Sequence, residues 1–541
     1  MSNVVFDLWY VREYPDREDT ELHIGIYSSR IEAETAIVRL KGQAGFRDYP
    51  QGFNIHETEL NRDGWTEGFA TVRYPSKTED SVADVQASPS NSSPNVPRPS
   101  NLFYLASLRR PVVDRAEGIY LWTADGRRFI DGSSGPVAVN LGYSNPAVLE
   151  AMRRQMEKTT FAYRLHFENE PAEELATNIA ERMPGGLDRI FFVSGGSEAV
   201  ESCLKLARQW AVATGQASRW KVIARMPSYH GGTYGSLAVT GDGLLTDTFA
   251  DQMRVMPTVP APTAYRDRDN LSPEERGLRY ADMLEERILA EGPESVLAFI
   301  MEPIGGAATG ALVAPDSYYP RIREICDRHG ILLIHDEVMS GIGRTGKFLG
   351  GDHWNCRPDI VSLSKGIGSG YVPLGALAAP GRIVEPVLKM GGFQHGHTYA
   401  GNPLACAAGL AIMGEMDRLD LTANAAAMGE LVLDGLRGLA KRFPFIADVR
   451  GKGLMAAVEY ADRETFEPLR ADWKIGQRVL DAAYARGLIV YSRRVKGGVQ
   501  GDYTMVAPPL IVTTDEVSEI ISILGDSIEA VARDLGLPVE G

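Results

Sequence analysis

The segment from Ile331 to Val338 constrains the fold of this 541-residue chain more than any other feature. Four apolar residues lead through His335 to Asp336, which predicts a buried strand ending in a carboxylate. A second apolar run, residues 359–364, is followed directly by Lys365. Because functional groups gather at the carboxyl ends of strands in open α/β sheets, we expect this acid and this amine to lie close together.

The rhythm of the chain around these two runs indicates the fold class. Between about residues 164 and 405, short apolar runs alternate with helical stretches, as in an α/β fold with a mostly parallel, helix-covered sheet. The predicted strands are residues 189–193, 221–224, 296–301, 331–335 and 360–363. Beyond about residue 409, a long amphipathic helix, short strands and a final helix predict a smaller α+β domain, which residues 101–163 join through a hairpin at 118–130.

A Ser/Pro/Asn-rich stretch at residues 76–100 has the composition of a disordered linker. The preceding residues predict strands at 4–11, 22–27 and 53–60 with a helix ending at Leu40, which together make a small α+β accessory module. We therefore divide the chain into five parts. Residues 1–75 form the accessory module and residues 76–100 the linker. Residues 164–408 form the cofactor-binding large domain, and residues 101–163 and 409–541 are the two parts of the small domain.

Composition excludes several classes of function. The net charge of −15 argues against binding to nucleic acid or to an anionic membrane. Four cysteines without CxxC spacing indicate neither a disulfide framework nor a zinc site, and no metal is expected. The amino terminus lacks the basic and apolar regions of a signal peptide, and no apolar stretch approaches membrane-spanning length, so we predict a cytoplasmic protein.

Further polar groups follow other predicted strands. The turn at residues 194–199 (SGGSEA) opens a helix and suits an anion, Tyr229 can stack on a flat ring, and Glu302 is another acid at a strand end. Each has an ordinary alternative: a helix cap, a packed loop and a structural ion pair. Together with Lys365 and Asp336 they indicate pyridoxal phosphate, since a lysine can form its Schiff base and an acid can keep its pyridine nitrogen protonated.

The motifs, taken in order, resemble the class III pyridoxal-phosphate aminotransferases, fold type I enzymes that include omega-amino-acid and amine:pyruvate transaminases. The resemblance covers roughly residues 101–541 and leaves out residues 1–100. It rests on residues 194–199, 229–231 (YHG), 302–303 (EP), 336–338 (DEV), 343–346 (GRTG), 358–366 and 397–403 (HTYAGNP).

The resemblance implies a role for each matching residue. Lys365 would form the Schiff base and move the proton, and Asp336 would pair with the pyridinium nitrogen. It also implies a homodimer or higher homo-oligomer with shared sites, in which Thr398 reaches the cofactor phosphate of the neighbouring subunit. The cofactor-binding set is Gly196, Ser197, Tyr229, His230, Glu302, Asp336, Val338, Lys365 and Thr398.

The substrate side is less constrained. Tyr491 occupies the position where some relatives carry a carboxylate-binding arginine, which leaves Arg493, Arg494 and Arg164 as candidates. The aromatic residues Trp122, Phe161 and Tyr163 are candidates for the pocket wall.

We expect a ping-pong transaminase that moves an amino group from an amine or omega-amino acid to pyruvate or a similar keto acid. A decarboxylase, racemase or aminomutase on the same scaffold is the alternative. A transcription regulator with a borrowed aminotransferase domain is disfavoured on charge grounds, because residues 1–75 hold 13 acids against 8 Lys plus Arg, a net of −5, and show no helix-turn-helix pattern.

Overall fold

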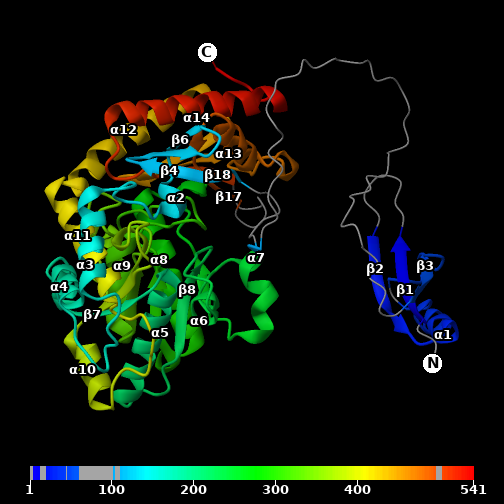
Figure 1. The fold of residues 1–541 in the computed structure, drawn as a ribbon, viewed down its shortest axis with the longest axis horizontal. Helices are drawn as coiled ribbons and strands as arrows, with labels where there is room; N and C mark the ends of the chain where they lie inside the picture. The colour runs from blue at the N-terminus through cyan, green and yellow to red at the C-terminus, as the bar shows by residue number, and fades with distance from the viewer. Residues whose placement is uncertain are drawn as a thin grey trace. The chain divides into compact units, whose positions relative to one another are not determined.

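The computed structural model describes residues 4–12, 20–43, 45–59, 101–103, 110–494 and 502–540. The chain forms two compact units, residues 1–103 and 104–541 (Figure 1). The predicted linker at 76–100 lies outside the described residues. The five-part division of the chain stays a prediction.

The first unit is a three-stranded antiparallel sheet with one helix. Its strand order is β2-β1-β3, and Leu8 and Tyr10 of the central strand are buried together with Ala33 and Ala36 of the helix. The helix begins where Ser29 Oγ accepts a hydrogen bond from the Glu32 amide, as serine does at helix starts. The elements are β1 (Val4–Arg12), β2 (Thr20–Tyr27), α1 (Arg30–Leu40) and β3 (Phe53–Glu59).

The second unit is built on a seven-stranded sheet in the order β7-β13-β12-β11-β10-β8-β9. Only β13 runs against its neighbours, so the predicted mostly parallel fold type I architecture is confirmed. The strands are β7 (Arg189–Val193), β8 (Lys221–Met226), β9 (Thr258–Pro260), β10 (Val296–Met301), β11 (Leu332–Asp336), β12 (Ile360–Leu363) and β13 (Gly375–Ala379).

Helices cover both faces of this sheet, which explains why its strands are apolar throughout. Side chains alternate between the two faces: Leu333 packs with α8 and α9, whereas Leu332 and Ile334 pack with α5 and α10. The helices before and around the sheet are α2 (Ser134–Val137), α3 (Pro146–Lys158), α4 (Glu170–Ala180), α5 (Gly196–Ala213), α6 (Tyr234–Ala238), α7 (Gly243–Thr246), α8 (Pro273–Glu291), α9 (Tyr318–His329), α10 (Gly381–Lys389) and α11 (Pro403–Arg418).

Two four-stranded sheets and three long helices complete the second unit. One sheet has the order β14-β15-β18-β17, and the other has the order β16-β6-β5-β4. In the latter, β16 pairs in parallel with β6, so Leu488 and Ile130 are direct neighbours despite their distance along the chain. The strands are β4 (Val113–Glu117), β5 (Tyr120–Thr123), β6 (Arg128–Asp131), β14 (Ile446–Lys452), β15 (Met455–Tyr460), β16 (Leu488–Ile489), β17 (Tyr491–Arg494) and β18 (Asp502–Val506), and the helices are α12 (Leu421–Arg442), α13 (Ile475–Ala485) and α14 (Thr514–Leu535).

Within the described part of the chain, no helix is both long enough and apolar enough to cross a membrane.

Candidate active site

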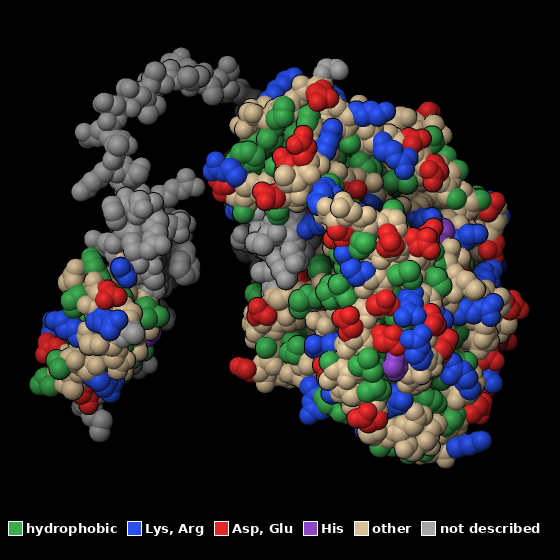
Figure 2. Space-filling view, turned by 180° about the vertical axis from the view of Figure 1, so that it is seen from behind, with side chains coloured by type: hydrophobic (Ala, Val, Ile, Leu, Met, Phe, Trp, Pro, Cys, Tyr) green, Lys and Arg blue, Asp and Glu red, His purple; other side chains and the backbone are tan. Residues whose placement is uncertain are grey.

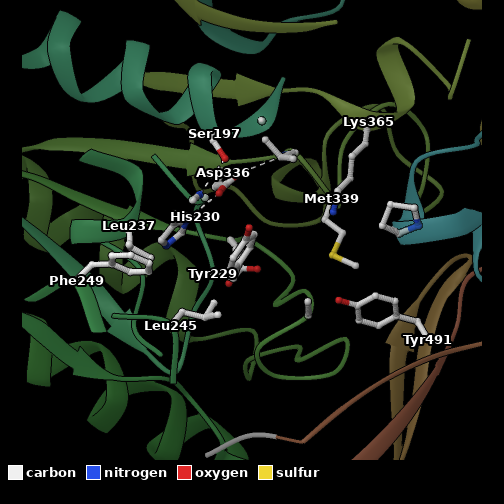
Figure 3. A pocket seen from close by; sticks show the side chains of 17 residues that line it. Ser197, Tyr229, His230, Leu237, Leu245, Phe249, Asp336, Met339, Lys365 and Tyr491 are labelled. Carbon is white, nitrogen blue, oxygen red and sulfur yellow. Dashed lines mark hydrogen bonds and ion pairs between the residues drawn. The ribbon is translucent and has the colours of Figure 1, made fainter. Parts of the chain in front are cut away.

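A cavity of about 610 Å³ opens at the carboxyl edge of the large sheet (Figure 3). Strands β8, β10, β11 and β12 run parallel, so the residues that follow them reach the same edge. Eight of the nine predicted cofactor-binding residues line this cavity: Gly196, Ser197, Tyr229, His230, Glu302, Asp336, Val338 and Lys365.

Asp336 ends the central strand β11 and is buried. Its Oδ1 accepts hydrogen bonds from the Val338 amide and from Ser362 Oγ, both at 3.1 Å, and its Oδ2 lies 2.7 Å from Nδ1 of His230. A carboxylate has about four acceptor positions, so these three contacts fix the group and leave room for one more donor. A protonated ring nitrogen is a donor of that kind.

Lys365 stands two residues beyond β12, where the backbone turns with a positive φ of 45° into a short 3-10 turn, η6 (Lys365–Ile367). Burial lowers the pKa of its amine to about 8, against the opposing charges of Asp336 and Glu302. At pH 7 an amine with that pKa is neutral in roughly a tenth of the molecules, far more than an exposed lysine. A partly neutral amine can act as nucleophile and as base.

Glycines after β7 and after β8 let the backbone pack closely beside the first turn of α5. A Cβ on Gly196 would stand 2.8 Å from Val338 Cγ1, and one on Gly231 would stand 2.7 Å from Ser197 Oγ. The Gly232 amide donates to Ser197 Oγ at 3.0 Å, which draws the 231–232 turn against the helix. The free amides of the first turn of an 18-residue helix attract an anion such as a phosphate.

Glu302 follows β10 and is buried beside the cavity. Its Oε1 accepts a hydrogen bond from the Gly306 amide at 2.8 Å, whereas Oε2 has no partner among the described residues. Burial raises the pKa of this carboxyl, although His230 and Arg225 act in the opposite direction. An unpartnered buried oxygen at the cavity edge is a ready contact for a bound molecule.

The remaining predicted residues do not line the cavity in the described part of the single chain. Trp122 packs under the Arg115 guanidinium at 3.7 Å, and Tyr163 packs edge-on against His166. Arg164 and Thr398 are exposed. The backbone of Arg493 pairs with Tyr503, and its side chain lies outside the described structure. Their roles stay predictions.

Several cavity residues were not predicted from the sequence. They form an apolar wall made mostly by loops and short helices, which lack a periodic signal. Met339 could have been found, because it follows Asp336 by three residues. Tyr491 was considered only as a departure from relatives, and the structure places it in the wall (Figure 3). The wall consists of Pro136, Leu237, Leu245, Phe249, Ala307, Met339 and Tyr491.

The site therefore offers a fixed carboxylate with a free acceptor position, a lysine amine of lowered pKa and a glycine-walled anion site. These three features fit pyridoxal phosphate, whose ring nitrogen, aldehyde and phosphate require such partners.

Comparison with known proteins agrees with this geometry. The family model described as aminotransferase class-III matches residues 106–528. The chain is 36% identical to the uncharacterised aminotransferase YodT of Bacillus subtilis over 79% of this chain and 96% of that protein. It is 32% identical to a putrescine–pyruvate aminotransferase of Pseudomonas aeruginosa over 78% of this chain and 91% of that protein.

A solved structure of similar fold is that of an (S)-enantioselective omega-transaminase from Thermomicrobium roseum. It superposes with a TM-score of 0.75 and 37% identity over 80% of this chain and 96% of that chain. With the family match and the curated relatives, this shows that the chain belongs to the class III aminotransferases, which are enzymes dependent on pyridoxal phosphate.

Proposed function

We propose that this aminotransferase takes an amine or omega-amino acid as donor and pyruvate or a similar keto acid as acceptor. The observation that carries the proposal is the part of the cavity wall formed by Leu237, Leu245, Phe249, Ala307, Met339 and Tyr491, which is apolar and aromatic. The described lining residues include no arginine, so the partner for the carboxylate of the keto acid stays among the candidates Arg164, Arg493 and Arg494. The relatives named for putrescine–pyruvate transfer and for omega-transamination support the same substrate class.

The residues of the chain divide the work. Pyridoxal phosphate, when bound, supplies the electron sink for breaking a bond at the amine carbon. Lys365 Nζ takes the proton from that carbon and returns it, because burial leaves part of the amine neutral near pH 7. Asp336, held by His230, keeps a negative charge where the ring nitrogen is to carry a proton. Gly196, Ser197 and the first turn of α5 hold the phosphate.

Val338 and Tyr229 complete the proposed cofactor site as walls on either side of the ring. Tyr229 remains about a third exposed, at 37%, so it borders the open part of the cavity, where a bound ring would cover it. Glu302 and His230 border the same space.

A keto-acid requirement separates this function from a decarboxylase, racemase or aminomutase on the same scaffold. The purified holoenzyme is mixed with a panel of amines, with and without pyruvate, and alanine formation is measured. We expect sustained turnover only when amine and pyruvate are both present. Turnover of a single amino acid without a keto acid would contradict the proposal and favour the alternative reactions.

We also propose a homodimer in which the loop around Thr398 reaches the neighbouring site. Leu165 is 81% exposed and Phe167 is 68% exposed, and large apolar side chains gathered on one segment mark an association surface. Phe161 packs edge-on against Tyr399, beside Thr398, with ring centroids 6.0 Å apart. Light scattering on the purified enzyme tests the proposal, and a fully active monomer would overturn it.

The expectation that no nucleic acid is bound has support from the surface. Acidic and basic side chains are intermixed over the face of residues 104–541 seen in Figure 2, and the whole chain carries a net charge of −15. A cytoplasmic location stays a prediction from the sequence.

A further inference from the structure

A loop next to the cavity is anchored on the side away from the cavity by hydrogen bonds from residues outside the predicted cofactor site. The 303–311 loop follows β10 and closes on itself where the Gly305 amide donates to the Leu312 carbonyl at 2.8 Å. On its inner side, Ala307 lines the cavity and the Gly306 amide donates to Glu302 Oε1. Movement of this loop would therefore change the wall of the cavity and the hydrogen bonding of Glu302.

The outer side of the loop rests on the C-terminal sheet. Tyr503 of β18 donates its hydroxyl to the Ala307 carbonyl, and Arg450 of β14 donates to the Thr309 carbonyl at 2.8 Å. The approach is close, because a Cβ on Gly310 would stand 2.8 Å from the Tyr503 ring. Tyr503 is 1% exposed, so its ring is held within the protein and its hydroxyl is fixed toward the loop.

A buried ionic cluster fixes Arg450 in turn. Its Nη1 lies 2.8 Å from both Asp448 Oδ2 and Glu459 Oε2, and its guanidinium stacks on the Tyr265 ring at 4.4 Å. Tyr265 donates to Glu459 at 2.9 Å, and Arg266 pairs with the same carboxylate. Every charge of the cluster is paired, which is the condition under which buried ions hold one geometry.

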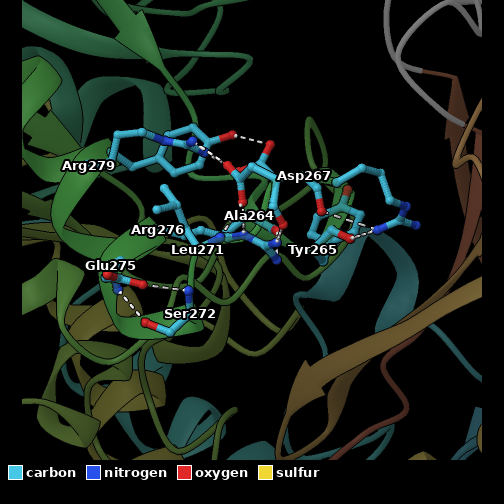
Figure 4. A network of polar contacts seen from close by, with 11 residues as sticks. Ala264, Tyr265, Asp267, Leu271, Ser272, Glu275, Arg276 and Arg279 are labelled. Carbon is cyan, nitrogen blue, oxygen red and sulfur yellow. Dashed lines mark hydrogen bonds and ion pairs between the residues drawn. The ribbon is translucent and has the colours of Figure 1, made fainter.

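The segment that presents Tyr265 is itself tied to the start of α8 (Figure 4). Arg276 and Arg279 of that helix pair with Asp269, and Arg279 also pairs with Asp267. A continuous set of polar contacts therefore connects the α8 region to the loop, through Tyr265, Glu459 and Arg450 of the cluster.

We propose that Tyr503 and Arg450 are positioning residues that set the cavity wall at Ala307 and thereby the size of amine that the enzyme accepts. Neither side chain touches the site of chemistry, and both act through backbone carbonyls of the 303–311 loop. This proposal extends the proposed function to substrate size. Only the kinetic readout of the test depends on the proposed function, and the exchange readout does not.

The test compares Tyr503→Phe with Tyr460→Phe in the holoenzyme. Both tyrosines are 1% exposed and both lie in the C-terminal sheet, but the Tyr460 hydroxyl donates to Thr504 Oγ1 at 3.0 Å, away from the loop. Arg450→Lys, which keeps the charge and loses the fork geometry, is a second variant should Tyr503→Phe fold poorly.

The first readout is hydrogen exchange of the peptide that spans residues 303–312. We expect exchange to be about fivefold faster or more in Tyr503→Phe and unchanged in Tyr460→Phe, since a carbonyl anchor of the loop is lost in the former alone. Unchanged exchange in both Tyr503→Phe and Arg450→Lys would overturn the proposal whatever the substrate is.

The second readout is the ratio of kcat/KM for 1-phenylethylamine to that for 2-aminopropane, with pyruvate as acceptor. We expect Tyr503→Phe to shift this ratio by about threefold or more, mainly through KM, and Tyr460→Phe to leave it as in the wild type. Equal loss for both amines with altered exchange would show a stabilising role and overturn the assignment to specificity. If the wild type accepts neither amine, two omega-amino acids of different chain length replace them in the ratio, and the exchange measurement decides independently whether the loop is anchored.

Discussion

The two halves of the active-site cavity are built differently. The cofactor half consists of polar residues at the strand ends of one sheet or just beyond them, among them Asp336, His230 and Lys365. The substrate half consists mostly of apolar residues on short helices and loops, such as Leu245 and Phe249, with Tyr491 at the start of β17. This difference suggests that changes in the first half should affect every substrate alike, whereas changes in the second half should redistribute activity among substrates.

Replacement of Lys365 by Ala should have the largest effect. Removal of the amine eliminates the only lysine among the described lining residues, and we expect kcat to fall by about 10²-fold or more for all amines, because proton transfer loses its base. Steady-state assays over an amine panel measure this, with circular dichroism as a check on folding. Retained turnover, or losses that differ strongly between amines, would break the comparison.

Asp336→Asn should have the second largest effect, and the loss of kcat should again be similar for all amines. The amide keeps the size of the side chain but removes the negative charge beside the ring-nitrogen position, so we expect kcat to fall by about tenfold or more, with little change in KM. Ser362→Ala is a matched control, because it removes one of the hydrogen bonds to Asp336 and leaves the charge in place. Equal turnover in Asp336→Asn and the wild type would refute the assignment.

The lowered pKa of Lys365 predicts a pH dependence for cofactor capture by the cofactor-free protein. Only the neutral amine attacks an aldehyde, so the capture rate should rise by about tenfold between pH 7 and pH 9 and level off above the pKa of about 8. Stopped-flow absorbance of added pyridoxal phosphate follows the reaction. A rate that keeps rising past pH 10 would show an unshifted lysine.

Phe249→Ala tests whether the substrate half of the cavity controls which amines are accepted. The ring lies in the cavity wall within η2 (Asp247–Gln252), remote in sequence from every cofactor contact (Figure 3). We expect kcat/KM to fall by about threefold to tenfold for a small amine and to rise for a bulky one, as one apolar contact is exchanged for space. Equal changes for both amines would show that Phe249 does not shape the substrate half.

Deletion of residues 1–98 should have the smallest effect. The described residues that line the cavity all belong to the unit 104–541, so the truncated protein should fold, bind the cofactor and turn over amines within about twofold of the full chain. Cofactor occupancy, amine turnover and oligomeric state are compared in both proteins. An unfolded truncation would show that the first unit belongs to the catalytic core.

The same contrast explains what could be predicted from the sequence. Strand ends carry polar residues after apolar runs, so the pattern of residues alone was enough to recognise Asp336, Lys365 and Glu302. Strand β13 was missed, because Gly375–Ala379 is glycine- and alanine-rich and lacks β-branched residues. The wall residues come from loops whose conformation depends on tertiary contacts, as Ala307 depends on Tyr503.

The pairing of β16 with β6 bears on how the enzyme is made. Residues 130–131 pair with residues about 360 positions later in the chain. At about 5–20 residues per second, roughly 20–70 seconds separate the synthesis of the two strands. The contiguous strands of the large sheet emerge well before that time. Pro136, in the cavity wall, follows Ser134, whose hydroxyl donates to the Ala507 carbonyl at 2.7 Å. The strands of the large sheet are therefore synthesised before the segments that complete the cavity wall, and the cavity cannot be finished until residue 507 has been made.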